Sequence, residues 1–321
     1  MANAFGLRLG SRASLTWVSI LGVALLLHLS TRSQAQSRGV YPPGMSALNS
    51  GLTPEPGFTY SNQLLFYSRD QAKSDDGATL PITGNNSVLL DLNSLVWVSR
   101  KTVLKGARYS AIATLPFAKN DLTSDVHGNI SGGSGFADSY FVPLVLGWSK
   151  QSVSIRVLYG FLAPTGRFAV GGNDNVGSGY WTQTLSSGQT FYLTKGKLLT
   201  LSAYEMYEFH STQEGTGIHP GGTFDLDYSV ARTFGFRNRN RLTRPQIGVD
   251  GYEMHQTTAK TGPAITADQS RERYAVNAIG FASSVALPRR NFNLTMKFFR
   301  EFANRATFQG YSLQVSGGMS F

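Results

Sequence analysis

Hydrophobic and polar residues alternate with a period of two along most of the chain. The clearest case runs from Tyr311 to Phe321, where every second residue is apolar or glycine and the residues between them are small or polar. A second case begins at Thr223, with Phe224 on one face and Asp225 and Asp227 on the other. Alternation of this kind is typical of β-strands that have one apolar face.

The same alternation recurs along the chain and predicts about twelve strands, each with roughly the 9 to 11 residues that a tilted membrane strand needs, or a little more. The predicted strands lie near residues 57–67, 86–99, 104–117, 135–148, 152–164, 186–195, 197–210, 221–235, 242–257, 272–287, 291–303 and 308–321. The links between them alternate in length: 68–85, 118–134, 165–185, 211–220 and 258–271 are long, whereas 100–103, 149–151, 195–196 and 288–290 are tight. An even strand number with long loops on one rim and short turns on the other is typical of outer-membrane barrels.

The direction of the apolar face separates a membrane barrel from a soluble one. A soluble barrel turns its apolar face inward, whereas a membrane barrel turns it toward lipid and must close because lipid cannot satisfy the backbone groups of a free edge. In this chain the face opposite the apolar one is rich in Ser, Thr, Gly, Gln and Asn. We therefore expect an all-β fold, a transmembrane antiparallel β-barrel of residues 57–321 with a polar lumen.

Residues 1–35 have the features of a cleaved signal peptide. Arg8 and Arg12 precede an apolar run, and Ser33 and Ala35 supply the small residues that signal peptidase reads. The apolar run is shorter than the roughly 20 residues of a spanning helix. Together with the barrel pattern, this predicts export to the outer membrane of a bacterial cell.

Residues 36–56 do not suit a strand of the barrel wall. Tyr41, Pro42, Pro43 and Gly44 lie at the start of a Pro-rich stretch with little periodicity. This stretch either folds into the lumen as a plug-like segment or hangs in the periplasm as a tail. We expect the plug, which would narrow the pore.

Composition and charge narrow the function further. The chain has no cysteine, which excludes disulfides and Cys-ligated metal sites. Its formal net charge is +10, and much of the positive charge falls in the predicted short turns. A basic periplasmic rim would meet the lipids of the outer membrane, or would simply be solvated. We expect no nucleic-acid partner.

Several segments resemble a known family of outer-membrane transporters, the family of the MetA pathway of phenol degradation. The resemblance lies in Gly39–Gly44 (GVYPPG), Asp138–Trp148 (DSYFVPLVLGW), Ala163–Phe168 (APTGRF), Ile247–Tyr252 (IGVDGY) and Lys297–Phe302 (KFFREF). It implies an outer-membrane barrel for passive uptake of small hydrophobic or aromatic compounds. The strand from Tyr311 to Phe321 also resembles the C-terminal signal read by the barrel assembly machinery, which implies that machinery as a partner.

Charged residues on the polar strand faces are the candidates for lining the pore: Arg108, Arg156, Asp225, Asp227, Lys297 and Glu301. Such groups set the selectivity of a pore or pair with one another across neighbouring strands. Mutual pairing is plausible for Lys297 and Glu301, which lie four residues apart on one face. Tyr180 and Trp181 follow a Gly-rich stretch and would form either an inward-folded aromatic gate or part of an ordinary surface loop.

An enzyme is the main alternative, because some outer-membrane barrels are lipases. Only His210 has a serine beside it, and the histidines of the mature chain are scattered singly. The sequence therefore predicts no catalytic residues, no metal site and no cofactor. A general porin or a structural barrel is the other alternative.

Overall fold

The structure is a computed structural model that describes residues 39–125, 128–238, 241–287 and 291–321. Residues 37–321 form one compact unit. The predicted signal peptide, residues 1–35, lies outside the described residues.

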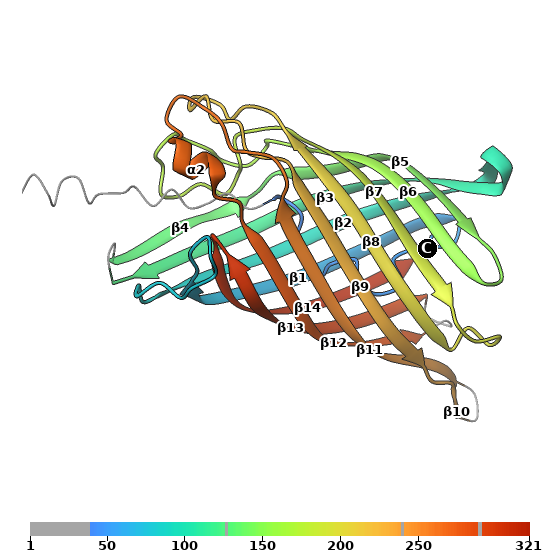
Figure 1. The fold of residues 1–321 in the computed structure, drawn as a ribbon. Helices are drawn as coiled ribbons and strands as arrows, with labels where there is room; N and C mark the ends of the chain where they lie inside the picture. The colour runs from blue at the N-terminus through green and yellow to red at the C-terminus, as the bar shows by residue number, and fades with distance from the viewer. Residues whose placement is uncertain (1–38, 126–127, 239–240, 288–290) are drawn as a thin grey trace, which may run out of the picture. The chain divides into compact units, whose positions relative to one another are not determined.

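Strands make up most of the described chain (Figure 1). In chain order they are β1 (Gly57–Ala72), β2 (Gly84–Val103), β3 (Ala107–Ser124), β4 (Gly128–Phe136), β5 (Ser139–Ser149), β6 (Val153–Ala163), β7 (Thr182–Tyr192), β8 (Leu199–His210), β9 (Thr223–Thr233), β10 (Phe236–Asn238), β11 (Arg241–Gln256), β12 (Ala275–Leu287), β13 (Phe292–Arg305) and β14 (Phe308–Ser320). Two short helices accompany them, η1 (Leu104–Gly106) and α2 (Ala267–Arg271). Within the described residues, no helix has the length and apolar character needed to cross a membrane.

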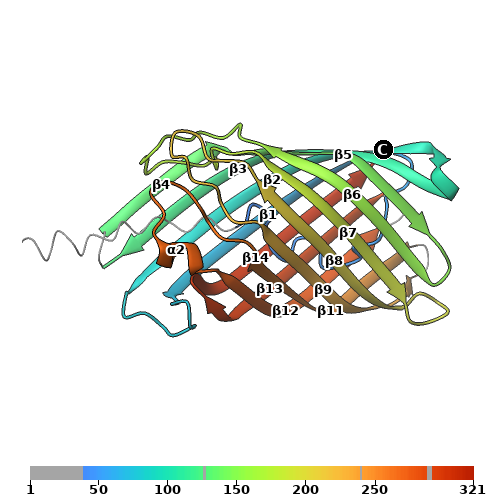
Figure 2. The same cartoon turned by 45° about the horizontal axis from the view of Figure 1, so that its top comes forward.

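Antiparallel pairing closes the sheet into a barrel, as predicted. Around the ring, neighbouring strands pair in chain order, except that β3 pairs with β5 and β9 pairs with β11, and β1 pairs with β14 to close the ring. Twelve strands form the ring, and the strands lie tilted and side by side along it (Figure 2). Closure leaves no unpaired edge along the wall, which is the condition for placing a sheet in lipid.

The burial of side chains is inverted relative to a soluble protein. Along β9, Thr223, Asp225, Asp227 and Ser229 are buried, whereas Val230 is exposed. Large apolar side chains such as Leu185, Ile247 and Phe281 are exposed on other strands. The polar face therefore lines the lumen and the apolar face forms the outer surface.

Three elements were not predicted from the sequence. Residues 118–134 were expected to form a loop, but β3 runs to Ser124 and β4 pairs back onto it, with Phe117 opposite Phe136. The link at 236–241 contains β10, which extends the sheet as a hairpin with β11. The expected loop 258–271 includes α2, whose first turn is capped by the Thr266 side chain.

Candidate functional site in the barrel lumen

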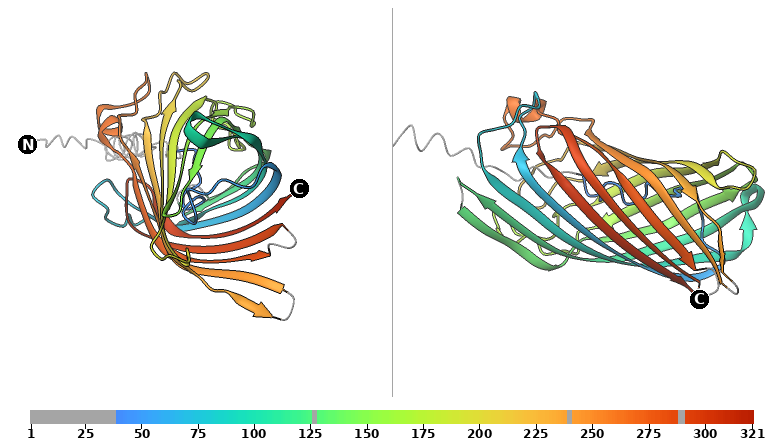
Figure 3. Two further views of the ribbon diagram at one scale, coloured as in Figure 1. Left: turned by 90° about the vertical axis from the view of Figure 1, so that its right-hand side faces the viewer. Right: turned by 90° about the horizontal axis from the view of Figure 1, so that it is seen from below.

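The segment before β1 lies inside the barrel rather than beside it. Its residues contact inward-facing side chains of β7, β8, β9, β11, β13 and β14 through hydrogen bonds given below. Figure 3 shows the segment, in blue, within the ring of strands. We call residues 39–53 the luminal segment.

The luminal segment begins near the end of the barrel that carries the long loops. The amide of Gly39 donates to the Tyr274 hydroxyl at 2.7 Å, and the amides of Val40 and Tyr41 donate to the Glu208 carboxylate at 2.9 and 2.7 Å. Glu208 also lies 3.4 Å from Nε2 of His210. One buried carboxylate thus holds two consecutive backbone amides, an arrangement that fixes the entry of the segment.

Asp227 holds the next turn of the luminal segment. Its carboxylate accepts from the Tyr41 hydroxyl at 2.5 Å, from the Gly44 amide at 2.8 Å and from the Ser46 amide at 2.9 Å. Burial, followed by the nearby Asp227 carboxylate, raises the pKa of the Tyr41 phenol well above its usual value. The phenol therefore stays protonated and remains the donor in this contact.

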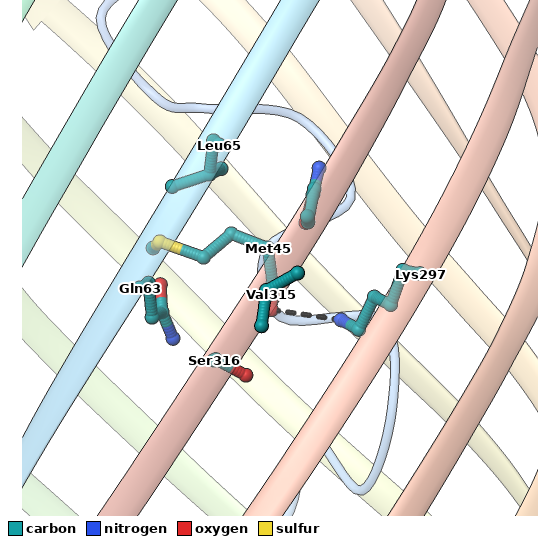
Figure 4. Close-up of a pocket in the computed structure, with 7 residues that line it drawn as sticks. Met45, Gln63, Leu65, Lys297, Val315 and Ser316 are labelled. Atoms are coloured by element: carbon teal, nitrogen blue, oxygen red, sulfur yellow. Dashed lines mark hydrogen bonds between the residues drawn. The ribbon is translucent and has the colours of Figure 1, made fainter.

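Strands β13 and β14 hold the same turn of the luminal segment through its carbonyl groups. Lys297 donates to the carbonyl oxygens of Gly44 and Met45 at 2.8 and 3.0 Å, and the Gln314 side chain donates to that of Pro43 at 2.9 Å. Figure 4 shows Lys297 and Met45 from two sides of a small cavity of about 10 Å³. Such a volume holds about one water molecule, so the turn packs closely against the wall at this point.

Gly44 is required at this turn for two reasons. Its φ of +81° favours glycine, and a Cβ there would lie 2.7 Å from the Phe299 ring and 2.9 Å from the Tyr252 ring. Both rings are fully buried and belong to an inward-facing apolar cluster with Met254, Tyr274 and Val276. The lumen thus has an apolar wall beside its polar one, which the sequence analysis did not foresee.

The luminal segment continues toward the other end of the barrel. Ala47 accepts from the Ser229 hydroxyl at 2.7 Å, Asn49 donates to the Gln246 side chain at 2.8 Å, and the Gly51 amide donates to the Thr190 hydroxyl at 3.0 Å. Strand register places Ser229 and Gln246 successively further from the loop end than Asp227. The segment therefore runs along the lumen before it enters β1 at Gly57.

Two buried carboxylates in the lumen lack a hydrogen-bond partner. Asp225 is 1% exposed, Asp250 is 0% exposed, and neither carboxylate oxygen of either residue has a partner. They lie on the same inner face as Asp227, one row toward the loop end and one row away from it. A buried carboxylate without a hydrogen-bond partner destabilises the folded barrel.

The remaining predicted site residues do not gather at one place. Arg156 is half-buried, its Nε atom is buried without a partner, and its guanidinium lies 5.8 Å from the centre of the Tyr204 ring. Arg108 is half-buried on β3, opposite Gly147 of β5. Tyr180 is buried, with its ring 5.2 Å from that of His210. Trp181 is 48% exposed and contacts Phe161, so the structure does not bring it to the other candidates.

The expected pairing of Lys297 with Glu301 is wrong. Glu301 instead lies 3.4 Å from Nε of Arg69, and it accepts from the Gly310 amide at 2.9 Å. Lys297 is directed to the luminal segment, as described above. The reason is that the segment supplies carbonyl acceptors inside the barrel, which strand alternation alone cannot reveal.

Several residues that hold the luminal segment were missed. Glu208, Gln246 and Tyr274 bind it directly, and Asp250 lies on the same wall. Glu208 and Asp250 are charged residues on inward-facing strand positions, so the alternation pattern could have identified them. Among the residues that the structure describes, no three His, Asp or Glu side chains gather as a possible metal site.

Comparisons with known proteins agree with this barrel. A family model described as "Putative MetA-pathway of phenol degradation" matches residues 69–316. No curated protein sequence matches the chain. The chain is similar to the solved COG4313 outer membrane channel from Pseudomonas putida F1, with 13% identity, a TM-score of 0.68, and coverage of 88% of this chain and 100% of that one.

Two other solved structures match less well. The β domain of the Bordetella autotransporter BrkA has 14% identity and a TM-score of 0.48, covering 83% of this chain and 100% of that one. The CymD monoaromatic hydrocarbon channel has 9% identity and a TM-score of 0.32, covering 84% of this chain and 89% of that one.

Proposed function

The chain belongs to the MetA-pathway phenol-degradation family, and from this premise we propose that it is a channel for passive uptake of small hydrophobic or aromatic compounds. Its closed barrel with an apolar exterior is that of a protein of the bacterial outer membrane. The solved channel with the same fold agrees with this location.

One observation carries the proposal of an apolar solute. The lumen has a fully buried apolar wall, formed by Tyr252, Met254 and Phe299, directly beside the turn of the luminal segment at Gly44. Once the turn is displaced, a solute that moves along this wall exchanges water for aromatic and thioether surface, which favours apolar molecules. A hydrated sugar gains little there.

In this proposal the luminal segment is a plug that restricts the path. Asp227 accepts hydrogen bonds from the backbone amides of its central turn, and Lys297 donates to the carbonyl groups of the same turn. Passage then requires local displacement of the turn, and no covalent step or cofactor is involved. In this proposal the path is narrowest at the turn formed by Tyr41, Pro42, Pro43 and Gly44.

We also propose that assembly depends on the last strand. In β14, Tyr311 faces outward beside Phe66 and Phe298, and Phe321 packs beside Phe58. An exposed aromatic strand of this kind suits recognition by the barrel assembly machinery.

The test is a flux assay with refolded protein of residues 36–321 in vesicles that contain lipopolysaccharide, which slows unaided passage of apolar solutes. We expect protein-dependent uptake of a monoaromatic compound to exceed that of a sugar of similar size, measured against vesicles without protein. Equal flux of both solutes would favour a general porin. Absence of flux from a correctly folded barrel would favour an enzyme or a structural barrel.

A further inference from the structure

A second candidate site lies at the rim of the barrel, away from the luminal segment. A cleft of about 430 Å³ is lined by Gly57, Phe58, residues 97–101 and Phe321. These residues come from the start of β1, the end of β2 and the position directly after β14. The cleft therefore lies at the rim with the short turns, opposite the end where the luminal segment begins.

Aromatic side chains form the wall of the cleft. Phe58 and Trp97 are directly paired residues on neighbouring strands, and the Phe58 and Phe321 rings stack with centroids 6.5 Å apart. All three side chains are exposed. Backbone hydrogen bonds between Phe58 and Phe321 at 2.9 and 3.3 Å fix the two rings relative to each other. The wall is thus exposed and held in place by the sheet.

Two cations lie at the polar end of this wall. Arg100 and Lys101 line the cleft, and both are exposed. Within the described residues neither cation has a carboxylate at ion-pair distance, since the ion pairs there all involve other residues. Two neighbouring cations without acidic partners form a site for an anion.

The position of the cleft selects the kind of anion. The exposed apolar side chains of the outer surface, among them Tyr60, Leu64 and Leu95, continue directly from the aromatic wall along β1 and β2. Aromatic rings mark the level of the lipid headgroups in membrane barrels, and Lys and Arg at that level attract anionic lipid. A free phosphate ion would use the cations and leave the aromatic wall without a role.

We propose that this cleft binds an anionic phospholipid. Its phosphate lies between Arg100 and Lys101, and the first part of an acyl chain lies against Phe58, Trp97 and Phe321. The proposal depends on the membrane location of the barrel and is independent of what passes through the lumen.

Trp97 provides a local reporter for the test. In a Trp148→Phe and Trp181→Phe background of residues 36–321, Trp97 is the single tryptophan. Dibrominated lipids quench the fluorescence of a nearby tryptophan. The quenching of Trp97 fluorescence by dibrominated phosphatidylglycerol, relative to dibrominated phosphatidylcholine, therefore measures the lipid preference of the cleft. We expect the reconstituted protein to prefer phosphatidylglycerol.

Removal of one cation at a time identifies the site. Arg100→Gln and Lys101→Gln are each expected to lower the preference on the order of fivefold, the effect of about 1 kcal/mol per cation near an anionic surface. Lys105→Gln is the matched control, because Lys105 is an exposed cation in η1, directly after β2, and does not line the cleft. It is expected to leave the preference near that of the parent protein.

Three results would overturn the proposal. The first is an equal loss of preference in all three variants, which would indicate general attraction to a basic rim. The second is a parent protein that shows no preference for phosphatidylglycerol. The third is loss of the preference when inorganic phosphate alone is added, which would identify the cleft as a simple anion site.

Discussion

At the scale of single residues, two aspartates on one face of β9 differ in their surroundings. Asp227 accepts three hydrogen bonds from the luminal segment, whereas Asp225, two residues earlier, has no partner. Both are 1% exposed, so burial does not distinguish them. The pair therefore isolates the contribution of the hydrogen bonds.

We expect Asp227→Asn to loosen the luminal segment and Asp225→Asn to leave it unchanged. The amide of asparagine cannot accept at both of its terminal atoms, so a buried donor loses its partner at a cost of about 1–3 kcal/mol. Backbone hydrogen exchange of residues 41–48 should then accelerate by roughly 5- to 150-fold in Asp227→Asn only. Equal exchange in the two variants would show that Asp227 does not hold the segment.

A glycine pair tests the fit of the same turn. Gly44 and Gly171 both have positive φ, +81° and +71°, but only Gly44 is enclosed, because a Cβ at Gly171 would meet nothing within 4 Å. Gly44→Ala therefore adds overpacking, about 1–3 kcal/mol, to the backbone strain that both variants share. We expect a higher open probability in planar bilayers for Gly44→Ala, with Gly171→Ala close to the parent channel.

At the scale of elements, the luminal segment and the barrel wall are separable. The wall closes through the pairing of β1 with β14, which runs from Thr59 to Ala72 and involves no residue of the segment. Deletion of residues 39–53 should leave a folded, heat-modifiable barrel and remove the side chains and backbone that fill the lumen near Lys297.

We expect this deletion to raise single-channel conductance several-fold in planar bilayers. Circular dichroism and gel mobility of the same sample control for folding. Conductance equal to that of the full barrel would show that another part of the wall sets the constriction, and would remove the plug from the proposed mechanism.

At the scale of the whole molecule, strand alternation was sufficient to predict the closed twelve-stranded barrel and the direction of its faces. It failed where the pattern is absent. β4 pairs with β3, but its sequence, GNISGGSGF, is Gly-rich and does not alternate between apolar and polar residues. The luminal partners of Lys297 and Asp227 were out of reach for another reason: they are backbone groups of a segment without regular structure, and sequence pattern does not report where such groups lie.

The outward direction of the apolar face has a consequence for stability in lipid. Leu185 and Leu193 are both 54% exposed, but Leu185 lies within β7, whereas Leu193 follows its last residue. Trp181 and Phe191, both exposed, flank Leu185 on the same outer face. Leu185 is thus placed within the hydrocarbon layer and Leu193 at its boundary.

Substitution of each leucine by arginine tests whether its position faces lipid or water. In a bilayer, Leu185→Arg should lower the free energy of unfolding by about 2–4 kcal/mol and Leu193→Arg by about 0–1 kcal/mol, because the cost of a cation falls from the midplane to the interface. Urea unfolding in phospholipid vesicles measures both. If the two losses were equal and small, the outer surface at Leu185 would be in water and the membrane placement of the barrel would be wrong. If they were equal and large, packing at the two sites rather than depth in lipid would determine the cost.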